Sequence, residues 1–597
     1  MAADNIRIGG ASGFWGDAAH ATRQLLDEGN LDFIVYDYLA EITMSIMARA
    51  RAKDPSAGFA SDFVPVAMQP NLADIAAQGV KIVANAGGVN PLGCAEALRE
   101  QIKAQGLSLK VAVVHGDDLL GQKDQLATLG ATEMFSGTPF PPVDRIASIN
   151  AYLGAFPIAK ALEAGADIVI TGRCVDSAVT LGACIYSFGW TEMDLDLLAQ
   201  GSLAGHLLEC GTQATGGNFT DWENLLDSFA DAGYPIAEIA EDGNFVCSKP
   251  QNTGGTVTVG TVAEQMLYEI GDPQAYLLPD VSCDFSQVTM SQVAKDKVAV
   301  SGALGNPPSN SYKVSATWAD GFRGGEQWTY YGRDAERKAR AFAQHVLTRA
   351  RRVLKRNKLP DYSETLVEVI GAEAHYGDYR SQHEVREVAV KLAAKHNSAA
   401  GISILFKETV GMALSAPPGL TAFAGGRPRP SPVVRLFSML LDKSEVSISV
   451  DFEGQSFDCS ERPENDPDTL GITRPPAPTA NSDSPMVEVS LEKLAWARSG
   501  DKGDKANIGV IARRPEYLPW IWASLDEAIV TQRFAHFLKG PVERFLLPGL
   551  PAINFLLHDV LGGGGIASLR NDPQGKGYSQ LLLEQNIKIP ATLAETL

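Results

Sequence analysis

The first 200 residues alternate short, continuous apolar runs with longer segments whose apolar residues recur every three or four positions. Continuous runs are typical of strands buried on both faces, and the longer pattern is typical of amphipathic helices. The predicted strands are IRIGG (6–10), DFIVYD (32–37), VKIVANAGG (80–88), LKVAVVHGD (109–117) and DIVITGR (167–173). The predicted helices cover 17–29, 42–54, 94–106 and 158–166. This alternation predicts an α/β fold with a parallel sheet, and hence a Rossmann-like N-terminal lobe.

The pattern changes after about residue 250. Strand candidates are found on both sides of one long amphipathic helix, 334–357, at 256–270, 296–303, 365–373 and 445–454. A stretch rich in Pro, Asp, Ser and Thr then interrupts all periodicity, which is typical of a linker. We therefore predict an α/β lobe at about 1–250, an α+β lobe at about 251–455, a linker at 456–486 and a compact C-terminal α+β domain at 487–597.

The composition of the chain argues against several classes of binding partner and of structural site. The formal net charge of −20 argues against nucleic acid as the main partner, because phosphate binding needs a basic surface. Seven scattered cysteines without a C-x-x-C pair predict neither a disulfide framework nor a zinc ribbon. No apolar run approaches the length of a membrane span, and the first residues do not read as a secretory leader. We expect a cytoplasmic protein without a membrane partner.

Ligands of open parallel sheets bind outside the carboxyl ends of the strands, so we searched the predicted strand ends. Candidate ligand-binding residues after the first three strands are Gly10, Ser12, Gly13, Asp37, Asn85, Gly87, Gly88 and Asn90. Candidate catalytic residues after the later strands are His115, Asp117, Arg173 and Asp176, to which the segment ECGTQATGGNF adds Cys210 as a catalytic and Gly211 as a ligand-binding candidate.

The first of these loops leaves three alternatives open. Its glycines follow the pattern G-G-x-x-G-x-x-G, whereas a dinucleotide fingerprint requires G-x-G-x-x-G. Asp37 has the spacing of a ribose-binding acid, but Phe14 and Trp15 lie where the backbone would approach pyrophosphate. The loop is therefore a site for an anion or acyl ligand, a dinucleotide site, or a purely structural turn.

Two later motifs have defined chemistry. Arg173 in VITGRCVDSA can hold a carboxylate or phosphate with two parallel hydrogen bonds, and Asp176 can orient it or act as a base. The alternative is a structural ion pair between the two. Cys210 is a conceivable nucleophile with His115 or His206 as its base. No metal-ligand spacing is present, although Mg²⁺ held through a substrate phosphate is compatible with the sequence.

The densest cluster of polar residues lies near the C-terminus. The segment WARSGDKGDKANIGV places several charged and polar side chains between two apolar strands, and the candidate ligand-binding residues are Arg498, Ser499, Asp501, Lys502 and Lys505. A solvated turn, an interdomain contact and an anion site all fit this pattern. The four glycines 562–565 further predict a nest of backbone N–H groups or a hinge.

Together these segments resemble a known family. IGGASGFWGD, ANAGGVNP, NAYLGAFPIAKALEAGADIVITGR and ECGTQATGGNF are similar to the acyclic terpene utilisation protein A family, over roughly 5–455. The tail from LEKLAWARSGDKGDKANIGVI onward resembles the ferredoxin-fold domain that accompanies that family. The resemblance implies a ferredoxin-like C-terminal fold, and it supplies no catalytic residues to carry over.

The resemblance also implies a metabolic setting. The family is associated with bacterial breakdown of citronellol- and geraniol-type compounds through CoA thioesters, beside a biotin-dependent geranyl-CoA carboxylase. We therefore expect an enzyme with lyase or hydratase-like chemistry on a small anionic substrate such as an acyl-CoA, with CoA as part of the substrate. The chain shows no biotinyl-lysine context, so no biotin is expected. The alternatives are a non-catalytic partner of the acyl-CoA carboxylase and an NAD(P)-dependent oxidoreductase. A homo-oligomer is expected.

Overall fold

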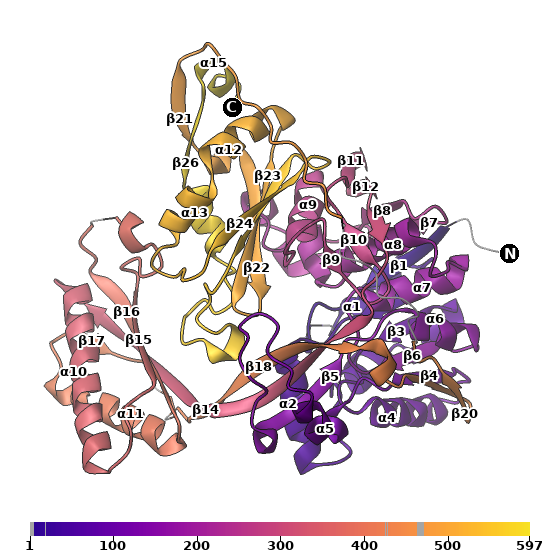
Figure 1. Cartoon of the computed structure of the whole chain (residues 1–597), viewed down its shortest axis with the longest axis horizontal. Coiled ribbons are helices and arrows are strands. Elements are labelled where there is room, and N and C mark those ends of the chain that lie inside the picture. The colour runs from indigo at the N-terminus through magenta and orange to yellow at the C-terminus, as the bar shows by residue number, and fades with distance from the viewer. Residues whose placement is uncertain (1–4, 18, 382, 424, 427, 462–470) are drawn as a thin grey trace.

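The computed structural model describes residues 5–17, 19–381, 383–423, 425–426, 428–461 and 471–597. The expected linker therefore lies partly outside the described residues, at 462–470. Figure 1 shows three bodies: an N-terminal body built on a large sheet, a second sheet with two long helices, and a C-terminal domain above both. In the described part of the chain, no helix combines the length and the apolar character that crossing a membrane requires.

Five parallel strands form the centre of the large sheet. In spatial order they are β1 (Asn5–Gly10), β2 (Phe33–Tyr36), β3 (Lys81–Ala84), β6 (Ile168–Thr171) and β4 (Val111–His115). Antiparallel strands extend it beyond β1 with β7 (Ile236–Ala240), β8 (Phe245–Ser248), β12 (Lys297–Ser301) and β11 (Thr289–Ala294). Beyond β4 they are β19 (Ser449–Phe452) and β20 (Gln455–Asp458). The five apolar runs are thus strands, as predicted.

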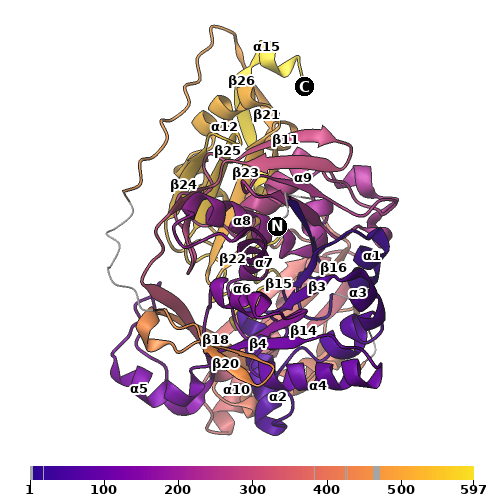
Figure 2. The ribbon, with the colours of Figure 1, turned by 90° about the vertical axis from the view of Figure 1, so that its right-hand side faces the viewer.

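Helices cover both faces of this sheet, which explains why its central strands are apolar throughout. One core cluster joins alternate strand residues to α6 (Phe156–Glu163), α7 (Ala178–Phe188) and α8 (Leu195–Leu208). The other joins the remaining strand residues to α1 (Ala21–Glu28), α2 (Glu41–Lys53), α3 (Leu72–Gln78) and α4 (Pro91–Ala104). Figure 2 shows α1 and α3 on the opposite side of the sheet from α6. The short helix α5 (Lys123–Thr128) follows β4.

A single long strand links the first two bodies. β14 (Ser311–Tyr331) pairs at its start with β5 (Ile146–Ala151) and along much of its length with β18 (Ser431–Asp442). Its second half pairs with β16 (Glu387–His396) and, near its end, with β17 (Leu420–Thr421); β15 (Glu364–Ile370) completes the sheet. The helices α10 (Ala335–Arg356) and α11 (Ala399–Met412) pack on it. The helix and the strand predicted at 334–357 and 365–373 are confirmed.

One strand candidate of the middle region is wrong. Residues 256–270 contain α9 (Val259–Leu267), because Thr258 accepts the N–H of Thr261 and caps a helix at that point. A small sheet follows it, formed by β9 (Tyr276–Leu277), β10 (Ser282–Asp284) and β13 (Leu304–Asn306).

The C-terminal domain contains an antiparallel sheet with helices. The strand order is β22 (Ala495–Lys502), β23 (Lys505–Ala512), β25 (Ala552–Leu557) and β24 (Val542–Leu547). A separate pair joins β21 (Met486–Ser490) to β26 (Asn586–Pro590). The helices are α12 (Leu518–Ser524), α13 (Glu527–Arg533), α14 (Tyr578–Leu583) and α15 (Ala591–Ala594). The mixed α/β class is thus confirmed, while a Rossmann-like identity of the first lobe stays a prediction.

Candidate functional site

The loop between β6 and α7 carries the most deeply buried cation of the candidate site. The Arg173 side chain is 4% exposed, and its Nη1 donates to Asp176 Oδ1 at 2.7 Å and to the Cys174 carbonyl at 2.9 Å. Its Nε is buried and has no acceptor among the described residues. A buried N–H donor without a partner is costly, so this atom marks a place for a ligand or a water molecule.

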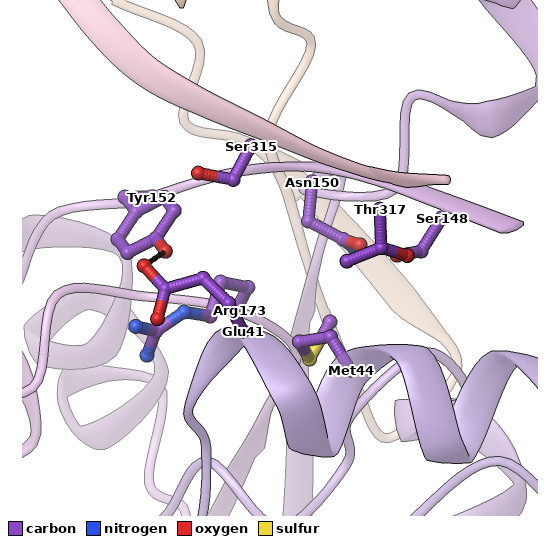
Figure 3. A pocket seen from close by; sticks show the side chains of 8 residues that line it. All are labelled: Glu41, Met44, Ser148, Asn150, Tyr152, Arg173, Ser315 and Thr317. Carbon is purple, nitrogen blue, oxygen red and sulfur yellow. Dashed lines mark hydrogen bonds between the residues drawn. The ribbon is translucent and has the colours of Figure 1, made fainter. Parts of the chain in front are cut away.

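Three residues from distant segments lie around the Arg173 guanidinium, and Figure 3 shows two of them, Tyr152 and Glu41. The Arg173 Cζ lies 4.1 Å from the centre of the Tyr152 ring, and the Tyr152 hydroxyl donates to Glu41 Oε1 at 2.5 Å. Lys313 Nζ, from β14, lies 3.3 Å from the same oxygen. Burial alone would raise the pKa of Glu41, but Lys313, Arg173 and the Tyr152 hydroxyl outweigh it and hold that pKa well below its usual value. Glu41 is therefore ionised at neutral pH.

A small cavity adjoins this group. Its lining residues come from α2, the β5 region, the β6–α7 loop and β14: Glu41, Met44, Ser148, Asn150, Tyr152, Arg173, Ser315 and Thr317. The cavity volume of about 10 Å³ leaves room for about one water molecule. A larger cavity, about 780 Å³, lies elsewhere, between α6, α7 and the Pro307–Pro308 turn, and none of the predicted site residues lines it.

The end of β2 contributes a second part of the site, which unites three predicted residues. Asn85 Nδ2 donates to Asp37 Oδ1, while Asn85 Oδ1 accepts the N–H of Tyr38 at 2.7 Å. Ser12 Oγ donates to the Asp37 carbonyl oxygen at 2.9 Å. Burial, and then the nearby charge of Asp176, raise the pKa of Asp37 well above its usual value. Asp37 is thus an acid that retains its proton far more readily than an exposed aspartate.

The site extends to the C-terminal domain through further carboxyl groups. Burial raises the pKa of Glu269 well above its usual value and that of Asp501, on β22, to about 6. Lys576 Nζ lies 3.3 Å from Glu269 Oε1 and 3.7 Å from Asp501 Oδ1, and burial lowers its pKa to about 8. Lys502 Nζ lies 5.9 Å from the centre of the Tyr276 ring. Predicted residues of the first and last domains therefore belong to one charged interface.

Several predicted glycines pack against the chain itself. A Cβ on Gly10 would lie 2.7 Å from the Leu208 carbonyl oxygen, and one on Gly13 would lie 2.9 Å from the Cys210 carbonyl carbon. These close approaches are a sufficient reason for the glycines of the first loop, because residues 208–210 occupy the space beside them. No ligand is needed to explain them. The same contacts leave little room for a dinucleotide pyrophosphate there.

The turn after β3 is filled in the same way. A Cβ on Gly87 would overlap the Thr171 carbonyl oxygen, and one on Gly88 would overlap the Met47 sulfur. Asn90 caps α4 by accepting the N–H of Gly93 at 3.1 Å, and it donates to the Ala57 carbonyl at 2.9 Å. These three residues stabilise the packing of α2 and α4 against the sheet.

His115 and Asp117 do not act together. His115 Nε2 lies 2.9 Å from Asp451 Oδ2 on β19, at the side of β4 that faces away from β6. Asp117 Oδ2 accepts the backbone N–H of Arg173 at 2.9 Å and the Asn150 amide at 2.8 Å, and burial raises the pKa of Asp117 to about 7. Asp117 therefore holds the Arg173 loop in place.

Cys210 is in the site but is poorly suited to nucleophilic attack. Burial, followed by the charges of Glu209 and Glu269, raises the pKa of the Cys210 thiol well above its usual value. The reactive form of cysteine is the thiolate, which this environment disfavours. Gly211, the next residue, adopts a left-handed conformation with φ of 55° at the start of a short 3₁₀ turn.

The remaining C-terminal candidates make structural contacts. Arg498 Nη1 donates to the Asn218 carbonyl at 2.9 Å, which joins the C-terminal domain to the segment after α8. Ser499 Oγ donates to the Gly575 carbonyl at 2.7 Å, inside the domain. Lys505 Nζ lies 4.6 Å from the centre of the Phe135 ring. Of the five C-terminal candidates, Asp501 and Lys502 thus have charges near the shared site, and the buried Arg498 guanidinium also interacts with the charge of Glu269.

The glycine run 562–565 already has an anion beside it. Asp504 Oδ1 accepts the N–H groups of Leu561 at 3.1 Å and of Gly563 at 2.8 Å. The predicted nest therefore binds a carboxylate of the same chain. Within the described ranges, no group of three His, Cys, Asp or Glu side chains is arranged to hold a metal ion.

Sequence reasoning missed several members of the site. They are Tyr152, Lys313, Glu269 and Lys576, while Glu41 is recognisable only as a polar residue near the end of the second strand. Lys313 lies within a strand, and its partner Glu41 is 272 positions away. No local pattern signals such a pair.

With this geometry in place, comparison with known families gives a clear result. The family model described as acyclic terpene utilisation family protein AtuA matches residues 6–452, and that of the AtuA ferredoxin-like domain matches residues 489–588. The first match spans most of the chain, so the chain belongs to the acyclic terpene utilisation family, and its C-terminal domain is ferredoxin-like. No curated protein and no solved structure matches the chain.

Proposed function

We propose that this chain is an enzyme of acyl-CoA or branched carboxylic acid catabolism that binds an anionic substrate at the charged interface around Arg173. The observation that carries this proposal is a buried arginine near several carboxyl groups, whose Nε has no acceptor among the described residues. The substrate class is a CoA thioester of an acyclic branched acid, in keeping with the family. The reaction class is a lyase or hydratase step.

The chemistry of the interface supports proton transfer. Burial raises the pKa of Asp37 and Glu269 well above their usual values and that of Asp501 to about 6, so carboxyl groups that hold a proton more readily than exposed ones lie beside Arg173. Arg173 keeps its charge and is suited to a carboxylate or thioester oxygen. Lyase and hydratase steps next to a thioester need this combination of a fixed cation and a neutral-range acid or base.

The small size of the cavity beside Arg173 limits how a substrate can reach it. The space beside Arg173 holds about one water molecule, so an acyl group reaches it only when the surrounding elements separate. Arg498 on β22 donates to the carbonyl of Asn218, after α8, and thereby joins segments of two domains. We expect substrate binding to change the contact between these two segments.

The test measures binding and turnover with geranyl-CoA, its carboxylated product and free CoA. Wild type is expected to bind a thioester, and Arg173→Lys to bind it at least tenfold more weakly, because lysine lacks the planar fork. The matched control is Arg356→Lys, the same change at an exposed position near the end of α10. Wild-type protein that neither binds nor converts any of the three compounds would refute the proposal.

A further inference from the structure

A buried histidine–glutamate pair lies at the end of α8, beside the site. His206 is fully buried, and Glu209, the residue that caps the helix, is 8% exposed. His206 Nδ1 lies 2.8 Å from Glu209 Oε1, and His206 Nε2 lies 3.1 Å from the Met266 carbonyl oxygen. The pair connects α8 to α9, and it is not one of the contacts that the charged groups around Arg173 make.

These two contacts fix the proton count of the pair. A carbonyl oxygen only accepts hydrogen bonds, so Nε2 carries a proton. Nδ1 and Oε1 can approach to 2.8 Å only with a proton between them, because two bare lone pairs repel. The pair therefore holds one shared proton, either as an imidazolium–carboxylate ion pair or as imidazole with a neutral carboxylic acid.

The second oxygen of Glu209 has no such partner. Oε2 is buried and has no hydrogen-bond donor among the described residues. The charged and titratable groups around Glu209 come from four directions: Asp37 after β2, Asp176 after β6, Glu269 and Tyr276 after α9, and Lys502 on β22. A buried carboxylate oxygen that has no donor among the described residues, and that lies among these charged groups, has a free lone pair to receive a proton from a bound molecule.

We propose that Glu209 is the acid–base residue of the site and that His206 is its positioning residue. This inference rests on the proposed function for its substrate, a CoA thioester. In the step, the C–H bond next to the thioester carbonyl breaks and an O–H bond forms at Glu209 Oε2. The electron pair stays on the substrate as an enolate, whose charge Arg173 and Lys502 balance. Return of the proton in the closing step regenerates the carboxylate.

The first experiment follows exchange of the substrate's α-hydrogens with deuterium oxide in the full-length protein. It uses the saturated analogue of geranyl-CoA, because the α-hydrogen of geranyl-CoA itself lies on a double-bonded carbon and is not acidic. Glu209→Gln keeps the size of the side chain and is expected to slow exchange at least 100-fold, with binding changed less than threefold. Glu96→Gln, an exposed position on α4, is the matched control and should exchange at the wild-type rate. Wild-type binding without exchange, or equal exchange in Glu209→Gln, would overturn the assignment.

His206→Asn tests positioning. Asparagine can still donate to Glu209 but has no proton to share and no charge. Burial raises the pKa of Glu209, and the contact with His206 opposes that rise. The pH at which exchange becomes half-maximal should therefore move upward, with KM unchanged. A variant that loses rate equally at every pH would show that His206 is merely structural.

A second measurement needs no substrate. Nitrogen-15 spectra of the histidines, with His206 assigned from the His206→Asn variant, should show a protonated Nε2 and an Nδ1 that shares a proton at neutral pH. Glu209→Gln should remove the shared proton. An Nδ1 that neither carries a proton nor accepts a hydrogen bond in wild type would refute the pair regardless of ligand. Failure of all thioesters to bind would refute the proposed function, and the histidine spectrum would still decide on the pair.

Discussion

The loops that leave β1 and β3 differ from those that leave β2 and β6, although all four lie at the same edge of one sheet. The first two contain glycines, and their spare space is taken by residues 208–210 and by the Thr171 backbone. The other two contain charged side chains, and in the part of the chain that the structure describes the Nε of Arg173 has no hydrogen-bond acceptor. Close packing thus explains the glycines, and the charged side chains mark where a ligand is expected to bind.

The difference shows how to interpret a glycine-rich strand end. Glycine is required wherever two backbones approach closely, whether the second backbone belongs to a ligand or to the protein. Here the second backbone is the protein's own, and its approach carries Glu209 and Cys210 to the site. A buried side chain with an unmet hydrogen bond is therefore stronger evidence for a site than the glycines beside it.

The largest effect is expected from removing the central charge. Arg173→Gln leaves Asp37, Asp176 and Glu41 without their shared cation, and loss of one partner from a buried charge group costs about 3 kcal/mol or more. Urea unfolding should show this loss of stability, and thioester binding should disappear. Arg173→Lys keeps the charge and should recover most of the stability. A loss below about 1 kcal/mol in Arg173→Gln would show that the charged loops are not a connected unit.

The next effect concerns the residue that holds the Arg173 loop. Burial raises the pKa of Asp117 to about 7, so the folded protein binds a proton that the unfolded chain releases near pH 4. Stability from this group is therefore complete below about pH 4 and is lost as the pH rises to about 7. In wild type this group should lower the free energy of unfolding by about 4 kcal/mol at most between these two pH values. Asp117→Asn should lack this part of the fall. An unchanged pH profile of urea unfolding would contradict this assignment.

The sequence predicted part of this architecture for identifiable reasons. The five central strands were recognisable because both of their faces are buried, which forces continuous apolar runs. β14 was not recognisable, because Gly321, Gly324 and Gly325 interrupt its alternation. Gly324 is there because Ile402 and Phe406 of α11 lie where its side chain would be, a contact that no local pattern reveals.

Some residues of the candidate site could likewise be predicted from the sequence, and others could not. Asp37, Arg173 and Asp176 were predictable because they follow strands, and strand ends meet at one edge. Tyr152 and Lys313 reach Glu41 from 111 and 272 positions away, so only the fold brings them together. Asp501 and Lys502 were predicted because charged residues are dense in their segment. Their nearness to Glu269, however, depends on how two domains pack.

A smaller effect should separate the two kinds of glycine. Gly87→Ala places a Cβ against the Thr171 carbonyl and 2.6 Å from Pro91 Cβ, and such overpacking costs about 1–3 kcal/mol. Gly121→Ala is the matched control, because nothing lies within 4 Å of its added Cβ, and its stability should change by less than about 0.5 kcal/mol. Thermal unfolding measures both. Equal effects would mean that Gly87 is not there for packing.

The smallest effect compares two lysines that pair across one hairpin. Lys502 and Lys505 are opposite each other on β22 and β23, yet Lys502 faces the carboxyl groups and Lys505 faces Phe135. Lys505→Met should cost about 0.5–1 kcal/mol through loss of the cation–π contact and should leave ligand binding unchanged. Lys502→Met should cost little stability. It should instead move the pH dependence of binding upward, because Lys502 lowers the pKa of Glu209 and of Glu269. Two variants with the same pH dependence would place both lysines outside the site, and the C-terminal domain would then act on the first lobe only through packing.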